Sequence, residues 1–593
     1  MPLKSLLKEL VSFTGLESIS LPELMESTRK TMSTAVLPTG WKLIVTSLLL
    51  FSLSPCLLGQ EYFVSFKNKS NTPYSIEKPS EYLSTKSIVR RKRYGIAIDE
   101  RDLPVDPNYI AQIASLEEVF YFYSSKWLNG AVFSIRDSLT LFQIEELEFV
   151  KAVAPLRNYY KKRSANVSKE EDTKAFDGQI WSDTDYGPSY HQANMLNVPS
   201  LHNKGYRGKG MTIAVLDGGF NDLKKLSHFD SLQLDFRLLA QRDYVDLDHT
   251  SVDGSWHGMH VMSTMASNLQ GQLIGTAPEA NYILIRTEDS GSETPIEELN
   301  WVVGAEFADS MGADILNTSL GYTNYYHANG IKDSLLSYEW EDLDGNTSYI
   351  TRASDIAASR GLLVVNSAGN SGNSDWKYIG MPADGDSVLA IGALDSMENR
   401  IGFSSFGLPS SPQIKPNIAA MGHRIILAHK TSEGKDTLRI GSGTSFSGPI
   451  IAGAIACLWQ AKPELSNMEI FDIVQRSADR FNNPDTAYGY GLPDFEKALD
   501  LLSEKTVAYS PSLSYPNPFQ NYLMYSFRSE FCETLSLELH DLQGNIVTQQ
   551  LLTTKEGLNE FLLNTSTLRE GLYILVAKSK HHSDRQKLMK ETD

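Results

Sequence analysis

Apolar residues recur along this chain in patterns that predict three folded regions. Between residues 186 and 505, short apolar runs such as residues 211–216 alternate with amphipathic stretches. The helix predicted over residues 295–311 carries Ile296, Leu299 and Val303 on one face and ends at Gly312. This alternation is typical of a parallel sheet that helices cover on both faces. We therefore predict an α/β domain over residues 186–505.

The region before this domain predicts a small α+β unit over residues 60–163. Strand-like runs at residues 62–66 and 131–135 precede a helical stretch with Phe142 and Leu147, and a further run follows at residues 149–153. This unit shows no catalytic constellation. A polar, charged segment without an apolar period comes next and predicts an exposed linker over residues 164–185.

Residues 1–59 have the layout of a leader followed by a secretory signal peptide. Lys42 precedes an apolar run at residues 43–51, and Pro55 and the small residue Gly59 follow it. A membrane-spanning helix needs about 20 apolar residues, and Pro55 interrupts this run too early for one. We expect cleavage near Gly59 or Gln60, with Met32 as an alternative start of translation.

After residue 510 the pattern changes to short alternating strands. Leu535, Leu537 and Leu539 are spaced by two, a turn signal lies at residues 543–545, and another apolar run occupies residues 571–575. Strands of this length separated by turn signals predict a β-sandwich over residues 510–593.

The amino-acid composition excludes several classes of protein. The chain has 593 residues, of which 41% are apolar and 21% charged, so several globular domains are expected. A net charge of -18 argues against a nucleic-acid-binding surface, which needs clustered Lys and Arg. Of the 3 cysteines, Cys56 lies in the predicted signal, which leaves Cys457 and Cys532. Two distant thiols predict neither a disulfide framework nor a cysteine-rich zinc site.

Amide hydrolysis needs a nucleophile, a base, a carboxylate that orients the base, and donors for the oxyanion. Asp217 follows an apolar strand and precedes two glycines, although such a carboxylate could simply cap a turn. His257 begins a segment that is apolar from Val261 onward, which would place the base at the end of a helix. A metal site with His260 is the alternative, but no third ligand accompanies the pair, so we interpret His260 as buried and structural.

The nucleophile and the oxyanion donor have candidates further along the chain. Ser445 precedes a long apolar helix in which Pro449 is tolerated in the first turn, so its hydroxyl would lie at the positive helix end. Ser445 could also be a plain helix cap. Asn370, in a glycine-rich turn, offers a side-chain amide to the oxyanion, although Asn is common in such turns. Cys457 in the apolar helix is expected to lie in the core.

Together these residues resemble the subtilisin-like serine peptidases, the subtilases, over residues 186–502. The order Asp, His, Ser is that of subtilisin, and residues 443–449 match the family's Gly-Thr-Ser-x-x-x-Pro motif. The resemblance implies a triad of Asp217, His257 and Ser445, with Asn370 in the oxyanion hole. It also implies a substrate cleft, which would be lined by Ser319, Leu320, Gly321 and Gly369. The sequence departs from the family pattern at four places near these motifs, namely Gly218, Met259, residues 262–263 and Gly448.

This resemblance also implies roles for the regions on either side of the peptidase domain. The unit at residues 60–163 would be an inhibitory pro-domain, and a separate N-terminal module is the alternative. The C-terminal sandwich resembles the type A sorting domain of the type IX secretion system through residues 515–519, 541–545, 571–573 and 587–590. That resemblance implies export through the periplasm to the cell surface or the medium.

We therefore expect a secreted serine endopeptidase made as a zymogen. Its expected partners are protein or peptide substrates, its own pro-domain and the type IX secretion machinery, with no nucleic acid, and we expect a monomer. No cofactor is expected to be required. Structural calcium is common in the family, but the loop with Asp243, Asp246 and Asp248 is interpreted as a solvated turn, and no ligands are assigned. The alternatives are a catalytically silent surface protein on the same fold, and a lipase, which would need a Gly-x-Ser-x-Gly elbow.

Overall fold

The computed structural model describes residues 60–156, 174–175, 184–246, 251–326, 332–504, 512–515, 517–529, 531–555 and 557–591. The predicted leader and signal peptide at residues 1–59 lie outside these ranges, as does most of the predicted linker. Within them, none of the helices combines the length and the apolar character that crossing a membrane requires.

The centre of the fold is a seven-stranded sheet in which neighbouring strands run parallel, in the order β14-β13-β12-β11-β6-β10-β7. The predicted strand near residues 211–216 is β6, and its residues are buried throughout. Both predicted features, parallel strands and continuous apolar runs, are confirmed. The strands are β6 (Thr212–Asp217), β7 (Leu238–Asp243), β10 (Asn281–Arg286), β11 (Ile315–Thr318), β12 (Leu363–Ser367), β13 (Val388–Leu394) and β14 (Ile418–Met421).

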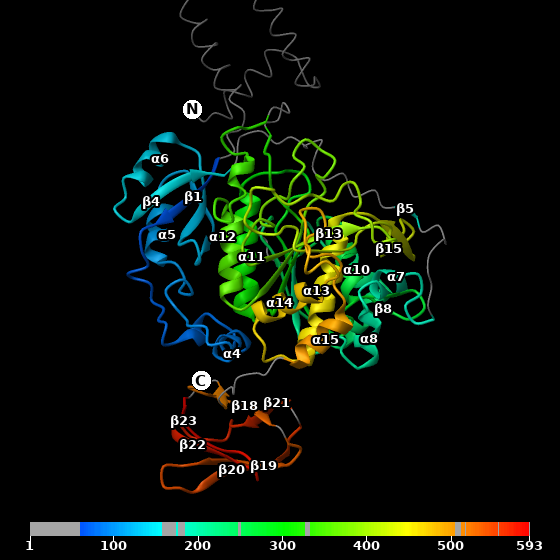
Figure 1. Cartoon of the computed structure of the whole chain (residues 1–593). Coiled ribbons are helices and arrows are strands. Elements are labelled where there is room, and N and C mark those ends of the chain that lie inside the picture. The colour runs from blue at the N-terminus through cyan, green and yellow to red at the C-terminus, as the bar shows by residue number, and fades with distance from the viewer. Residues whose placement is uncertain are drawn as a thin grey trace, which may run out of the picture. The chain divides into compact units, whose positions relative to one another are not determined.

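Helices pack on both faces of this sheet, and successive residues of a strand enter different cores. Ile213 and Val215 of β6 belong to one apolar cluster, whereas Ala214 and Leu216 belong to the other. The first cluster contains residues of α10 (His257–Ala266) and α13 (Thr444–Ala461), and the second contains residues of α11 (Ile296–Met311) and α12 (Tyr349–Ser359). These layers can be followed in Figure 1.

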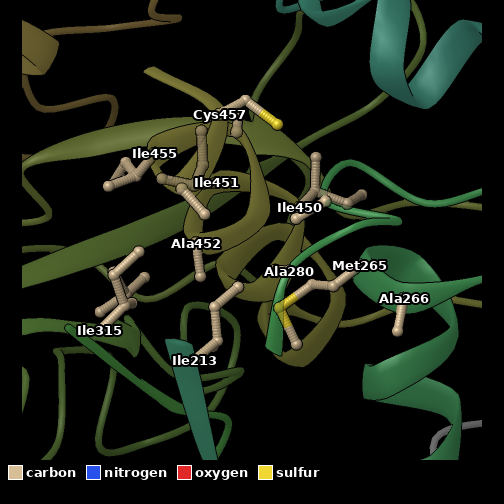
Figure 2. Packing of buried hydrophobic residues seen from close by; sticks show 14 of the residues in the cluster. Ile213, Met265, Ala266, Ala280, Ile315, Ile450, Ile451, Ala452, Ile455 and Cys457 are labelled. Carbon is tan, nitrogen blue, oxygen red and sulfur yellow. The ribbon is translucent and has the colours of Figure 1, made fainter. Parts of the chain in front are cut away.

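The helix α13 is apolar around its whole circumference because it lies deep in the first core. Figure 2 shows Ile450, Ile451 and Ile455 of this helix among side chains that include Ile213 of the sheet. Cys457 is 0% exposed, which confirms its predicted place in the core. The predicted end of α11 is also confirmed, since Gly312 takes the left-handed conformation with φ 84°.

Smaller elements complete this domain. Part of the predicted linker, residues 174–175, forms β5 and pairs antiparallel with β16, so this piece is a strand rather than an irregular connection. The elements are β5 (Lys174–Ala175), α7 (Tyr190–Asn194), α8 (Val198–Asn203), η2 (Leu223–Lys225), η3 (Ser227–Phe229), α9 (Asp230–Leu234), β8 (Asn268–Leu269), β9 (Leu273–Ile274), η4 (Trp340–Asp342), β15 (Ile425–Lys430), β16 (Asp436–Gly441), α14 (Asn467–Ser477) and α15 (Phe495–Glu504).

The N-terminal unit has a four-stranded antiparallel sheet in the order β2-β3-β1-β4. The predicted strands and helix are present, but Leu147 lies beyond the end of its helix. It packs against the small core of this unit, the apolar cluster that includes Val64, Phe133 and Ile144. Phe63, Tyr123 and Trp127 join the apolar cluster of α11 and α12, so this unit packs on those helices. Its elements are β1 (Gln60–Phe66), η1 (Pro79–Glu81), α4 (Thr85–Arg93), α5 (Pro107–Ala114), β2 (Val119–Ser125), β3 (Gly130–Ile135), α6 (Ser138–Glu145) and β4 (Val150–Pro155).

The C-terminal region forms two sheets, in the orders β17-β18-β21 and β20-β19-β22-β23. Leu535, Leu537 and Leu539 of β19 are each 0% exposed and share one core with Leu523 and Tyr525 of β18, as the alternation predicted. The strands are β17 (Leu513–Tyr515), β18 (Tyr522–Ser529), β19 (Thr534–His540), β20 (Ile546–Thr553), β21 (Gly557–Asn564), β22 (Gly571–Lys578) and β23 (Ser583–Lys590).

Candidate active site

Two residues of the predicted triad are in direct contact at the carboxyl edge of the sheet. Asp217 is the last residue of β6, and His257 is the first residue of α10. The His257 Nδ1 atom lies 2.8 Å from Oδ1 and 3.0 Å from Oδ2 of Asp217. A Cβ atom on Gly258 would lie 2.5 Å from the Gly219 carbonyl oxygen, so only glycine lets the helix begin so close to the carboxylate.

The Asp217 carboxylate is buried and held by few groups. Its side chain is 1% exposed, and the Gly218 N–H donates to its Oδ1 atom over 2.7 Å. Among the described ion pairs, its partner is the His257 imidazole. A buried carboxylate that binds Nδ1 fixes the orientation of the ring and stabilises its protonated form.

Ser445 lies in the first turn of α13, where backbone N–H groups have no partner within the helix. The residue is 6% exposed, and its hydroxyl donates to the Ser319 carbonyl oxygen over 3.4 Å. The centroid of the ring of the next residue, Phe446, lies 6.2 Å from that of the His257 ring, and the two rings are tilted by 34°. The structure thus brings the N-terminal turn of α13 to the side of the histidine that the sequence predicted as the base.

Asn370 follows β12 and is oriented by the residue before the predicted nucleophile. Its Oδ1 atom accepts hydrogen bonds from the N–H and the hydroxyl of Thr444, each over 2.9 Å. Since this end of the amide is the acceptor, Nδ2 is the donor end, as an oxyanion donor requires. The Gly369 N–H donates to the Thr444 hydroxyl over 3.2 Å. Sequence reasoning gave Thr444 no role, and only its position beside Ser445 hinted at one.

The predicted cleft residues Ser319, Leu320 and Gly321 directly follow β11, which ends at Thr318. The Ser319 hydroxyl donates to the Ser445 carbonyl oxygen over 2.9 Å, so this segment is tied to the nucleophile turn. The next residue, Tyr322, exchanges two backbone hydrogen bonds with Met381, over 2.9 and 3.0 Å. The predicted cleft segment therefore lies against Ser445.

A half-buried carboxylate that the sequence did not reveal lies beside this group. Glu288 follows β10, and its Cβ atom lies 3.5 Å from the position that a Cβ on Gly218 would take. Its Oε1 atom accepts a hydrogen bond from the Tyr322 hydroxyl. Burial, reinforced by the charge of Asp217, raises the pKa of Glu288 to about 7, although the Tyr322 hydrogen bond opposes this. The one available signal was that β10 ends at the same sheet edge as its parallel neighbour β6.

The acidic loop considered for calcium is occupied by an arginine. Asp243 is 1% exposed rather than solvated, because the Arg286 guanidinium binds its Oδ2 atom over 2.8 Å and also binds Asp246. Asp248 lies outside the described residues. Among the residues described, no group of three or more His, Cys, Asp or Glu is placed to hold a metal ion. His260 is buried, and its Nε2 atom lies 3.1 Å from Nδ1 of His429, as its structural interpretation predicted.

A parallel sheet between helical layers, with a carboxylate, a histidine and a serine at its carboxyl edge, defines a hydrolase of the serine peptidase class. Sequence comparison is consistent with this class. Residues 208–491 match the subtilase family, residues 61–173 match the propeptide domain of S8 peptidases from Bacteroidota, and residues 514–591 match a secretion system C-terminal sorting domain. The chain thus carries a subtilase-family peptidase domain between a propeptide and a sorting domain.

Several characterised proteins are similar to the peptidase domain. Subtilisin DY of Bacillus licheniformis is 28% identical over 307 residues, which are 51% of this chain and 96% of that protein. Subtilisin Savinase of Lederbergia lenta is 29% identical over 307 residues, with the same coverage of 51% and 96%. A solved protease from Pseudoalteromonas arctica is 22% identical with a TM-score of 0.42, and the match covers 54% of this chain and 99% of that chain.

These findings establish the general activity of the protein and its route of secretion. A subtilase domain behind its propeptide is a secreted serine protease made as a zymogen. The C-terminal sorting domain directs the protein to secretion by the type IX system.

Proposed function

We propose that this protein is a serine endopeptidase in which Asp217, His257 and Ser445 form the catalytic triad. The observation that carries the proposal is the contact between His257 Nδ1 and both Asp217 oxygens, at 2.8 and 3.0 Å. Because Nδ1 is bound to the carboxylate, Nε2 is the ring nitrogen that accepts a proton from the nucleophile.

The reaction proceeds by acyl transfer. The Ser445 hydroxyl loses its proton to His257 Nε2 as its oxygen attacks the carbonyl carbon of the scissile bond. The Asn370 Nδ2 group and the Ser445 N–H donate to the oxyanion, and the imidazolium returns the proton to the leaving amine. Water, deprotonated by the same imidazole, then hydrolyses the ester on Ser445. Residues Ser319, Leu320, Gly321 and Gly369 line the cleft that holds the substrate backbone.

The proposal extends to the organisation of the chain. Residues 1–59 serve as leader and signal peptide, 60–163 as inhibitory pro-domain, 164–185 as linker, 186–505 as peptidase domain and 510–593 as sorting domain. The mature enzyme acts as a monomer on protein or peptide substrates. None of the proposed steps requires a metal or another cofactor.

Labelling with a fluorophosphonate probe tests the nucleophile. We expect the secreted wild type to be labelled and to hydrolyse casein, and Ser445→Ala to do neither. Ser503→Ala, an exposed serine on α15, is the matched control and should behave as the wild type. Equal labelling of Ser445→Ala would reject this nucleophile, and absence of both label and hydrolysis from the wild type would favour a silent binding protein.

A further inference from the structure

The pro-domain makes two neighbouring polar contacts with the peptidase domain, besides the apolar packing of its sheet on α11 and α12. The first is the end of β2, where Ser125 and the N–H groups of Lys126 and Trp127 donate to the Glu306 carboxylate over 2.5, 3.0 and 3.0 Å. The second is α4, which lies more than 25 residues earlier in the chain and belongs to neither the sheet nor the small core of the pro-domain. Its contacts include the pair of Lys86 with Asp314, over 2.8 Å, and a set made by arginines.

Arg90 of α4 joins the C-terminal ends of two peptidase helices. Its guanidinium donates to the carboxylate of Asp309 near the end of α11 and to the carbonyl oxygen of Ala313 just beyond that end. The same group donates over 3.1 Å to the carbonyl oxygen of Arg360, which caps α12. Helix C-termini carry unpaired carbonyls and partial negative charge, which a cation complements.

Arg91 and Arg360 extend this contact into a network of alternating charge. Arg91 makes a bidentate pair with Asp102 of the pro-domain, over 2.9 and 3.1 Å, and binds the second oxygen of Asp309 over 2.8 Å. From the peptidase side, Arg360 binds Asp99 over 2.7 Å. We call the six side chains the arginine latch, and they are Arg90, Arg91, Asp99 and Asp102 of the pro-domain with Asp309 and Arg360 of the peptidase domain.

The backbone of both helix ends is shaped to receive this segment. Gly312 and Gly361 have φ of +84° and +91°, which side chains rarely adopt. A Cβ on Gly312 would lie 2.7 Å from the Cβ of Lys86, and one on Gly361 would lie 3.0 Å from Ile96. Residues 86–96 therefore pack so closely on the two helix ends that both positions require glycine.

The latch is buried and its charge balance depends on both partners. Arg91, Asp102 and Asp309 have side chains that are at most 1% exposed. The described side-chain partners of Asp309 are Arg90, Arg91 and Lys126, and all three belong to the pro-domain. Removing one partner of a buried pair costs far more than breaking a surface pair, because a charge is left without compensation.

We propose that the arginine latch is a second anchor of the pro-domain, next to the β2 contact and joined to it by Lys126, and that it sets how long the cleaved pro-domain stays on the peptidase domain. The occupant of this peptidase surface is the segment of residues 84–102 of the same chain. Release of the inhibitor then requires the latch to open in addition to the sheet leaving α11 and α12.

The test uses the full chain with Ser445→Ala, so that the outcome does not depend on catalysis. A recognition sequence for a site-specific protease replaces part of residues 157–173, the protein is captured through a C-terminal tag, and the N-terminal fragment is followed after cutting. Arg91→Met should speed its release roughly 100-fold or more. Arg91→Lys keeps the charge but loses the bidentate geometry, so its release rate should lie between that of the parent, which carries only Ser445→Ala, and that of Arg91→Met.

Arg136→Met is the matched control, because Arg136 forms an exposed pair with Glu118 inside the pro-domain. We expect release within about twofold of the parent, as for other surface pairs. Arg360→Met probes the latch from the peptidase side and replaces Arg91→Met if that protein does not fold. The proposal is overturned if Arg91→Met, or Arg360→Met in its place, folds and releases the N-terminal fragment at the rate of the parent, while the release rate of Arg136→Met is also unchanged. Failure of both to fold, while Arg136→Met folds, also overturns it, because the network would then be needed for folding rather than for retention.

Discussion

The peptidase domain buries carboxylates at both ends of its sheet, but it pairs them differently. At the carboxyl edge, Asp217 binds a histidine and a backbone N–H, and Glu288 binds a tyrosine. At the opposite helix ends, Asp309 binds guanidinium groups. Burial alone would raise the pKa of Asp309, yet Arg91 and Arg90 outweigh it and lower that pKa, whereas the pKa of Glu288 rises to about 7.

This difference separates a surface built for catalysis from one built for binding. A guanidinium beside Asp217 would neutralise the field that stabilises the imidazolium during acyl transfer. Neutral donors hold the carboxylate in place and leave its charge to act on His257. At the arginine latch the requirement is the reverse, because a docked surface with an uncompensated charge would not stay docked.

The largest effect is expected from removing the charge of Asp217. Asp217→Asn keeps the size of the side chain but favours the wrong histidine tautomer, so kcat should fall by about 10⁴-fold. The measurement is kcat on a peptide substrate after the zymogen is processed by an added protease that is then inhibited. Asp235→Asn, an exposed carboxylate of the same domain, should leave kcat unchanged. A loss below tenfold in Asp217→Asn would show that the carboxylate does not orient the base.

A smaller loss is expected at the oxyanion donor. Asn370→Ala removes the Nδ2 group, and kcat should fall by about 10²- to 10³-fold with little change in KM, the range known for one such donor in a subtilisin. Thr444→Val serves as the graded comparison. It deletes the hydroxyl bond to Asn370 Oδ1 but keeps the backbone N–H bond, so its loss should be smaller. An effect of Asn370→Ala on KM alone would assign Asn370 to substrate binding.

The two ends of the sheet also differ in how far the sequence predicted them. Asp217, His257 and Ser445 each stand at the end of an apolar segment, so periodicity places them at strand and helix ends, and the resemblance to subtilases joins them. The latch offers no such signal, because Arg90 and Asp309 are 219 positions apart and a basic run in a helix looks the same whether it is solvated or buried. The same applies to Glu288, whose burial depends on Tyr322 and on the neighbouring end of β6. The local pattern of apolar residues predicts helices and strands, whereas the pairing of buried charges depends on tertiary contacts between segments that are far apart in the sequence.

The smallest effect is expected in the pH dependence of the free energy of unfolding, through the titration of Glu288. Its pKa of about 7 lies above the ordinary value of 4.5, so the folded state binds this proton more tightly than the unfolded state does. Stability must therefore fall as pH rises from 4.5 through 7, by on the order of 1–3 kcal/mol for this group. Glu288→Gln has no proton to lose. In the Ser445→Ala background, its free energy of unfolding relative to the parent should increase between pH 5 and pH 8, as measured by urea denaturation.

Glu398→Gln, at an exposed position, supplies the control for the substitution of Gln for Glu. Burial and the charge of Glu288 both raise the pKa of Glu293 and of Glu297, so the difference between parent and variant reports these three carboxyl groups as one interacting set. If the difference stays constant with pH, Glu288 is ionised throughout and a cation must compensate it as at the latch. The contrast between the two ends of the sheet would then be lost, because both would balance their buried carboxylates with positive charge.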